Sequence, residues 1–386
     1  MDNAFYIHIP YCKQVCYYCD FHFRVAMKDK QAMLKAMQEE IFLRKDYLRL
    51  HNDRDSKTMI HTLYFGGGTP SVLTPEDLSL LLDAFRKYYT LSPDAEVTIE
   101  TNPDDLTPAY LEGLSQLGFN RLSIGIQSFF DDDLRWMNRR HNADEAIQSV
   151  NLAQKIGFDN INIDLIYGLP GMDAEKWKEN LTRAIALDVP HLSAYHLTIE
   201  SRTVFGRRKD KGESFGISEN DSVAQFEVLL DMLGKAGYEH YEISNFARSG
   251  FYSRHNTAYW RQIPYIGIGP SAHSYDGRSR QWNINNNTRY IDLLLDGKGE
   301  VWYEREILSP ADKYNDYVLT ALRTRWGIRL EYVRENFGYD FLNSLLSLAA
   351  KYIQTEFIRE ENSTYTLTTK GKMIADRIAS DLFIVT

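Results

Sequence analysis

The sequence predicts an α/β protein that joins a partial (βα)6 TIM-like barrel to a winged-helix-like α+β domain at its C-terminal end. Two observations predict this fold. Up to about residue 240, short apolar runs alternate with amphipathic helical stretches, which is the pattern of βα units around a parallel sheet. From about Ser309 the pattern changes to three helices, two short strands and a final helix.

Six strands are expected in the first part. They lie at 5–9, 61–65, 97–100, 121–126, 160–166 and 191–197. Helical periodicity follows each one, as at 30–47, 75–88 and 143–156, and Thr74 and Asn142 are suitable N-caps for the last two. Six units rather than eight predict an open barrel, wide enough at its side for a large substrate.

The last part is expected to hold helices at 311–323, 330–337 and 341–351, strands at 356–359 and 364–367, and a helix from Thr369. We interpret it as a packing or partner-docking domain, with DNA contact as the alternative. The expected boundaries are 1–240 for the partial barrel, 241–305 for a barrel-closing segment and 306–386 for the winged-helix-like domain.

Composition limits the function classes. The chain of 386 residues is 44% hydrophobic and has a net charge of −9, so a general nucleic-acid binder is not expected. No run of about 18 apolar residues predicts a membrane span, and the first residues lack a signal-peptide pattern, so we expect a cytoplasmic protein.

Three cysteines, Cys12, Cys16 and Cys19, stand at CxxxCxxC spacing on one loop after the first strand. This spacing suits three corners of a 4Fe-4S cluster, and three thiolates leave one iron open to a small molecule with amino and carboxylate donors. S-adenosylmethionine (SAM) is such a molecule. The alternative is a zinc site completed by His8 or His22.

Other unusual residues follow the ends of the predicted strands, where the loops of a βα-barrel meet at one mouth. They are Gly66-Gly67-Gly68, Glu100, Gln127, Asp164 and Tyr195-His196. Glu100 is a candidate for the SAM ammonium, and Gln127 and Asp164 for its methionyl group or ribose. Arg139 or Arg140 is a candidate for its carboxylate.

Between 201 and 216 the chain carries Arg207, Arg208, Lys209 and Lys211. We interpret this stretch as a solvated loop. The functional alternative is a lid whose cations meet carboxylates of a substrate, such as porphyrin propionates.

Five segments together resemble the oxygen-independent coproporphyrinogen III oxidase-like family of radical SAM proteins, over nearly the whole chain. They are the Cys12 loop, Gly66–Pro70 (GGGTP), 100–103 (ETNP), 124–129 (IGIQSF) and 164–171 (DLIYGLPG). The resemblance implies that these residues adjoin SAM: Tyr6, Tyr18, the backbone at Gly67, Gly68 and Thr69, and the side chains of Glu100, Gln127, Arg139 and Asp164. It thereby favours Arg139 over Arg140.

Within that family, the chain is most similar to the heme chaperones of the HemW type. The oxidases carry a fourth cysteine two residues after the third and a long extension before the motif, whereas here Phe21 stands at that position. Residues 255–260 (HNTAYW) match the HNxxYW motif of the chaperones, so His255 is a candidate heme ligand. The alternative for His255 and Asn256 is a hydrogen-bonded core turn; His273 is a second candidate ligand.

The resemblance implies a protein that binds heme and transfers it to acceptor proteins such as cytochrome subunits of respiratory enzymes. It assigns no catalytic residue, and a homodimer remains open. The rival functions are oxidative decarboxylation of a porphyrinogen, radical SAM chemistry on heme itself, and a purely structural metal protein.

Overall fold

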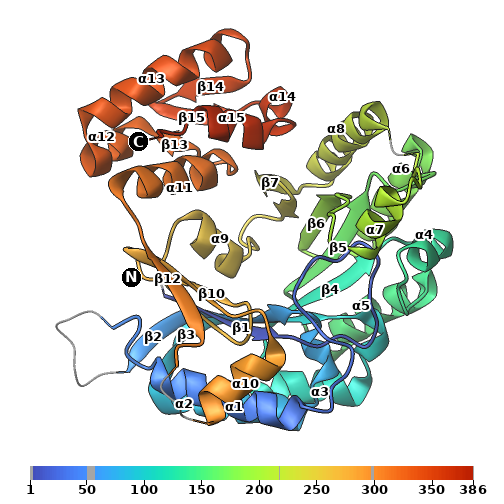
Figure 1. Cartoon of the computed structure of the whole chain (residues 1–386). Helices are drawn as coiled ribbons and strands as arrows, with labels where there is room; N and C mark the ends of the chain where they lie inside the picture. Colours follow the sequence, from blue (N-terminus) through green and yellow to red (C-terminus); the bar gives the residue numbers. More distant parts are fainter. Residues whose placement is uncertain (1–2, 50–56, 217, 297–299, 386) are drawn as a thin grey trace.

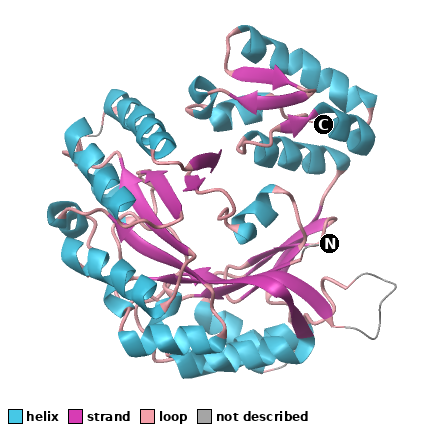
Figure 2. Ribbon diagram, turned by 180° about the vertical axis from the view of Figure 1, so that it is seen from behind, coloured by secondary structure: helices cyan, strands magenta, loops and turns pink. Residues whose placement is uncertain are grey.

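The computed structural model describes residues 3–49, 57–216, 218–296 and 300–385. One curved sheet of twelve strands carries helices on its outer side, and a separate α+β module lies above its open side (Figures 1 and 2). No helix in the described part of the chain has the length and apolarity that a membrane crossing requires.

The centre of the sheet is six parallel strands that lie side by side in chain order, and all six predicted strands are confirmed. They are β1 (Ala4–Ile9), β2 (Thr58–Gly67), β3 (Tyr89–Thr101), β4 (Arg121–Gln127), β5 (Ile161–Tyr167) and β6 (His191–His196). This arrangement is the partial barrel that the sequence predicts.

Helices connect these strands and cover the outer face of the sheet (Figure 2). They are α1 (Lys30–Leu43), α2 (Pro75–Tyr88), α3 (Pro108–Leu117), α4 (Asp131–Trp136), α5 (Ala143–Ile156) and α6 (Ala174–Ala186), with short 3-10 turns at Pro70–Val72 and Pro103–Asp105. Thr74 and Asn142 each form a capping box at the start of α2 and α5, as predicted.

The two faces of the central strands differ in chemistry. On β4, Leu122, Ile124 and Ile126 belong to the hydrophobic core under the outer helices, whereas the alternate residues Ser123 and Gln127 line a cavity on the inner face. Because successive side chains of a strand point to opposite faces, the apolar set is used for packing and the polar set is left for the site.

Further strands extend the sheet at both edges and leave it open. Beyond β6 lies β8 (Asn245–Ala247), which is antiparallel to β6, and then β7 (Glu239–Glu242), which is antiparallel to β8. Beyond β1 lie β9 (Tyr265–Ile268), β10 (His273–Tyr275), β11 (Ser279–Asn283) and β12 (Tyr303–Ile307). Strand β7 crosses the domain boundary that we expected between residues 240 and 241, and β12 crosses the one expected between 305 and 306.

A short helix, α9 (Arg254–Trp260), lies on the concave side of the sheet (Figure 1). Ser253 caps it through the amide of Asn256 at 3.2 Å. The Glu96 carboxylate of β3 accepts from the amides of Arg254 and His255, each at 3.0 Å. A side chain of the sheet therefore fixes where this helix begins.

We expected the stretch 201–216 to be a solvated loop, and this prediction is wrong. It contains helix α7 (Val204–Asp210), which is followed by α8 (Glu219–Lys235). Phe205 is fully buried and stacks on Trp136 with 4.0 Å between ring centroids. The apolar contact outweighs the solvation of the neighbouring basic residues.

The C-terminal module has its own hydrophobic core, which includes Tyr314, Val318 and Ile378. Its elements are α11 (Pro310–Leu322), β13 (Ile328–Arg329), α12 (Leu330–Phe337), α13 (Tyr339–Gln354), β14 (Ile358–Glu361), β15 (Thr364–Leu367), α14 (Thr369–Lys372) and α15 (Ala375–Asp381). The single final helix expected from Thr369 is divided in two at 373–374.

Candidate functional site

The loop after β1 places the three cysteines at the mouth of the barrel. Cys12 is buried, and Cys16 and Cys19 are half-buried; all three are free thiols. They line a cavity of about 380 Å³, named here the rim cavity. It is also lined by Tyr18, Gly67, Gly68, Thr69, Glu100, Gln127, Arg139 and Asp164. The structure thus brings together most of the residues that the sequence singled out.

Two of the thiols already have polar neighbours. The Thr69 hydroxyl donates to Cys12 Sγ at 3.2 Å, and Arg139 Nη1 donates to Cys16 Sγ at 3.3 Å. Burial raises the pKa of Cys12 to about 12 and that of Cys19 to about 11. Donors of this kind stabilise sulfur once it carries negative charge, as it does in a thiolate ligand.

Among the described residues, no three His, Cys, Asp or Glu side chains converge on the position of one metal ion. A 4Fe-4S cluster binds each thiolate at a different iron atom and therefore requires wider spacing between sulfurs than one ion does.

Both arginines line the rim cavity, and of the two it is Arg139 that is half-buried. Its Nη2 donates to Asn102 Oδ1 and to the carbonyl of Gly125, both at 2.7 Å. Its Nε is buried and has no hydrogen-bond partner among the described residues. Arg140, by contrast, is exposed and pairs with Asp104 at 2.9 Å. Arg139 is therefore the one with an unused buried donor.

Two carboxyl groups face the same cavity from β3 and β5. Glu100 accepts from Tyr64 Oη at 2.7 Å and from the Gly67 amide at 3.2 Å, and burial raises its pKa to about 7. Burial also raises the pKa of Asp164, which accepts from Asn162 Nδ2 at 2.7 Å. A cation that enters the cavity would favour ionisation of both groups.

The glycines after β2 are required by close packing. A Cβ at Gly67, whose φ is +114°, would lie 2.7 Å from the His8 ring, and a Cβ at Gly68 would lie 2.5 Å from the Tyr11 carbonyl oxygen. The amides of Gly67 and Gly68 donate to Glu100 and to the Ile9 carbonyl. These amides are therefore already used within the protein.

Gln127 has an unusual backbone. Its φ is +71°, a left-handed conformation that is rare outside glycine, and the register between β4 and β5 shifts just before it. The irregularity ends β4 and leaves the Gln127 side chain in the rim cavity wall.

Tyr6 and His255 are not among the residues that line the rim cavity. The Tyr6 ring lies 6.0 Å from the Tyr64 ring and 6.3 Å from the His255 ring, and its hydroxyl bonds to His8 Nδ1 at 3.1 Å. Tyr6 lines a second cavity, which is also lined by His8, His22, Tyr259, Tyr265, His273 and Tyr275 among others.

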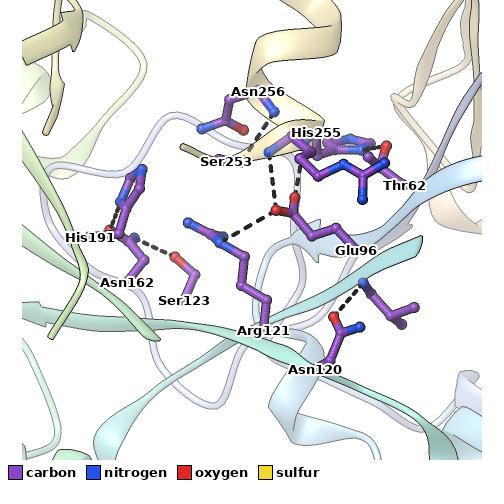
Figure 3. Close-up of polar contacts among 12 residues, drawn as sticks. Thr62, Glu96, Asn120, Arg121, Ser123, Asn162, His191, Ser253, His255 and Asn256 are labelled. Atoms are coloured by element: carbon purple, nitrogen blue, oxygen red, sulfur yellow. Dashed lines mark hydrogen bonds and ion pairs between the residues drawn. The ribbon is translucent and has the colours of Figure 1, made fainter. Parts of the chain in front are cut away.

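The His255 imidazole is buried and both of its nitrogens form hydrogen bonds, of which Figure 3 shows the one to Thr62. Nδ1 bonds to Thr62 Oγ1 at 2.8 Å, and Nε2 bonds to Tyr259 Oη at 2.9 Å. Burial lowers its pKa to about 3. This geometry fits the alternative of a hydrogen-bonded core turn, because neither nitrogen points into open space.

The surroundings of His255 form a polar network on the inner face of the sheet (Figure 3). Arg121 is 4.0 Å from Glu96, the carboxylate that holds the start of α9. Farther along, Asn162 bonds to Ser123 at 2.8 Å and to His191 at 2.5 Å. Glu96 of β3 and Thr62 of β2 bind α9 directly, so the motif at 255–260 is anchored to the barrel.

Several residues that line the two cavities were not predicted from the sequence. Asn102 and Ser123 line the rim cavity, and Tyr265, Tyr275 and Arg280 line the second one. A signal for Ser123 was present, since it alternates with the apolar residues of β4. Arg280 has no local signal, because its role depends on a neighbour from α11.

Comparison with known proteins identifies the family. Residues 6–184 match the model of the radical SAM superfamily. The chain is 32% identical to the heme chaperone HemW of Bacillus subtilis, over 97% of each chain. It is also 32% identical to the heme chaperone HemW of Haemophilus influenzae, over 99% of this chain and 97% of the relative.

The fold is that of a solved radical SAM enzyme. Coproporphyrinogen III oxidase (HemN) from Escherichia coli superposes with a TM-score of 0.84 at 24% identity, over 99% of this chain and 90% of the enzyme. That likeness shows the shared architecture, while the sequence similarity over nearly full length shows the closer kinship. The chain therefore belongs to the HemW family within the radical SAM superfamily.

Proposed function

We propose that the protein is a heme chaperone, which binds heme beside a SAM-ligated 4Fe-4S cluster and transfers the heme to acceptor proteins. Cytochrome subunits of respiratory enzymes are the proposed acceptors, and the cytoplasm is the proposed compartment. The observation that carries the proposal is the similarity over 97% of the chain to a relative named as a heme chaperone.

The rim cavity supports a cluster and SAM by its chemistry. Cys12, Cys16 and Cys19 are the proposed cluster ligands, and three thiolates leave one iron for another ligand. When bound, the cluster supplies an electron to the sulfonium of SAM. The chain's own task is to hold and orient both groups.

Charges around the rim cavity complement those of SAM. Glu100 and Asp164 offer carboxyl groups to its cationic ammonium and sulfonium, and the unpaired Nε of Arg139 offers a donor to its carboxylate. Tyr18 and Gln127 complete the proposed walls. The backbone at Gly67, Gly68 and Thr69 also lines the proposed SAM site.

Phe21 marks a difference between this chain and the oxidases of the family. It stands where the oxidases of the family carry a fourth cysteine, and its side chain is 73% exposed at the edge of the rim cavity. An aromatic ring provides no thiol, so the arrangement favours a chaperone over porphyrinogen decarboxylation.

The decisive experiment is a heme titration of the anaerobically reconstituted protein, monitored by Soret absorption, followed by transfer to an apo-cytochrome. We expect saturation near one heme per chain and transfer on addition of the acceptor. Incubation with coproporphyrinogen, SAM and reductant should yield no decarboxylated product. Substrate-coupled decarboxylation, or the absence of saturable heme binding, would refute the proposal.

Replacement of one cluster ligand tests the metal assignment. Cys16→Ala should abolish the broad visible absorption of the cluster and its iron and sulfide, because two remaining thiolates bind a cubane poorly. Gln14→Ala, on the same loop, is the control and should keep them. An unchanged absorption in Cys16→Ala would contradict the assignment.

A further inference from the structure

The second cavity, named here the side cavity, has a volume of about 580 Å³. It lies between the β9–β11 edge of the sheet, the cysteine loop and helix α11 of the C-terminal module. Its size falls within the range of about 300–1,000 Å³ that is usual for small-molecule and cofactor sites. Residues from both parts of the molecule are needed to form it.

Aromatic rings make up much of the side cavity wall. Tyr259 and Tyr265 pack edge to face with 4.6 Å between centroids, and Tyr275 lies 6.4 Å from Tyr265. Phe21 lines this cavity as well as the rim cavity. Such walls suit a flat, largely apolar ring system.

One imidazole in this cavity is free to bind a metal. His273 has an exposed side chain and makes no hydrogen bond to any residue that the structure describes; its ring lies near Trp282 at 6.3 Å. By contrast, both ring nitrogens of His8 are bonded, to Tyr6 Oη and to the His22 carbonyl. His22 Nε2 bonds to Asn287 Oδ1 at 2.7 Å.

The backbone just before His273 has an unusual conformation. His273 begins β10 and lies two residues after Ser271, which has a left-handed φ of +64° and also lines the cavity. The strained turn directs the chain just before His273.

Arg280 is the cation of the side cavity wall. It forms ion pairs with Asp316 at 3.4 Å and with Glu306 at 3.6 Å, its side chain is 40% exposed, and its Nε makes no hydrogen bond to a described residue. The other acid of the wall, Asp20, pairs with Arg202 at 2.7 Å. A ligand carboxylate that enters the cavity would compete with the two acids for Arg280.

We propose that the side cavity is the heme site, with His273 as the axial iron ligand and Arg280 paired with a propionate. The proposal rests on the proposed heme-chaperone function and deepens it. Phe21 then stands between heme and the cluster site. Tyr259 forms part of the heme wall and is held by the buried His255, so the HNxxYW motif shapes the site rather than ligating iron.

Heme titrations of His273 variants test the ligand. In the full-length, cluster-reconstituted protein, His273→Ala should weaken heme binding at least tenfold and abolish the histidine-ligated Soret and electron paramagnetic resonance signals. His273→Cys should give the red-shifted ferrous carbon monoxide adduct of a thiolate-ligated heme. The cluster absorption and SAM binding should be unchanged in both variants.

Matched variants exclude other ligands. His22→Ala, in the same cavity, and Tyr259→Phe, which removes the bond to His255 but keeps the ring, should both retain the histidine-ligated spectrum. Arg280→Gln should weaken the binding of heme more than it weakens the binding of heme dimethyl ester, which has no free propionates. Loss of the spectrum in His22→Ala, or a wild-type spectrum in His273→Ala, would overturn the site.

The two proposals fail in different ways. If the unaltered protein binds no heme, the chaperone function itself is refuted. If it binds one heme per chain and His273→Ala binds with the same spectrum and affinity, the function stands and the side cavity assignment is wrong.

Discussion

Burial of a carboxyl group at the edge of the rim cavity has a consequence for stability. The folded-state pKa of Glu100 is raised to about 7 by burial, against 4.5 for the ordinary group. Between these values the unfolded chain loses its proton while the folded chain keeps it. The free energy of unfolding therefore falls as pH rises from about 4.5 to 7, by at most about 3 kcal/mol for this group.

Glu100→Gln should remove this contribution. The unfolding free energy of Glu100→Gln minus that of the unaltered protein should increase from pH 5 to 7. Above pH 7 this difference should stay constant. Urea unfolding at several pH values measures it. Glu112→Gln, on exposed helix surface, is the control, and a difference that does not vary with pH would contradict the raised pKa.

His255 is predicted to act as a structural residue. His255→Ala would leave a cavity and remove the partners of Thr62 and Tyr259, at a cost of roughly 2–4 kcal/mol. His273→Ala, at an exposed position, should cost less than about 0.5 kcal/mol in the heme-free protein. Chemical denaturation compares the two, and equal small effects would show that the His255 hydrogen bonds contribute little.

At the scale of elements, one buried side chain of α1 ties the β9–β12 edge to the barrel. Glu40 is fully buried and accepts from the Gly269 amide, Asn283 Nδ2, Tyr290 Oη and Trp302 Nε1 at 2.8, 2.7, 2.5 and 3.1 Å. It also lies 3.3 Å from buried Arg44. A polar group with this many partners specifies where the edge strands sit.

Glu40→Gln should destabilise the protein by about 3–5 kcal/mol, because it leaves the buried Arg44 uncompensated and points a donor at other donors. The neighbouring Glu39→Gln serves as the control and should change stability by less than about 0.5 kcal/mol. Hydrogen exchange should show faster exchange in β9–β11 of the Glu40 variant. Unchanged exchange there would mean that apolar packing alone holds the edge.

Across the whole molecule, histidines with a lowered pKa make the fold sensitive to acid. Burial lowers the pKa of eight of them: His8, His22, His141, His191, His196, His240, His255 and His273. Each is protonated in the unfolded chain below about pH 6.5 but not in the folded chain. Their contribution to stability is present above pH 6.5 and is lost as the pH falls.

These eight histidines outnumber the six carboxyl groups whose raised pKa acts in the opposite direction, which are Glu100, Asp105, Asp133, Asp164, Glu242 and Asp316. We therefore expect the melting temperature to fall from pH 6.5 to 5. Circular dichroism melts in low-salt buffers measure it. A melting temperature that is constant over this range would contradict the burial of these rings.

His240 links the acid response to the junction of the two parts. Its Nδ1 is 2.8 Å from Lys372 Nζ of the C-terminal module, and its ring stacks on Phe246 at 4.3 Å. A protonated ring beside an ammonium group is repulsive. Acid should therefore weaken this contact between the two parts of the molecule.

Much of the fold was open to prediction because its signals are local. The six central strands, the capping boxes at Thr74 and Asn142, and the spacing of Cys12, Cys16 and Cys19 each depend on residues a few positions apart. The same holds for Glu100, Gln127 and Asp164. Parallel strands end at one rim, so residues at their ends must meet there.

The distant contacts were beyond local signals. The break in the final helix and the helix at Val204–Asp210 depend on packing, as the burial of Phe205 illustrates. Arg139 and Arg140 have the same neighbours in sequence, and the bonds of Arg139 to Asn102 and Gly125 distinguish them. Residue type alone left both arginines as candidates for binding the SAM carboxylate.

The family, the barrel strands and the proposed thiolate set could be predicted from the sequence, since each depends on short-range patterns. The surroundings of the histidines depend on the tertiary structure. His255 matches the HNxxYW motif yet is buried against Thr62 and Tyr259, while His273 is exposed in the side cavity that Arg280 also lines. The physical reason is that burial and free lone pairs depend on neighbours contributed by remote parts of the chain.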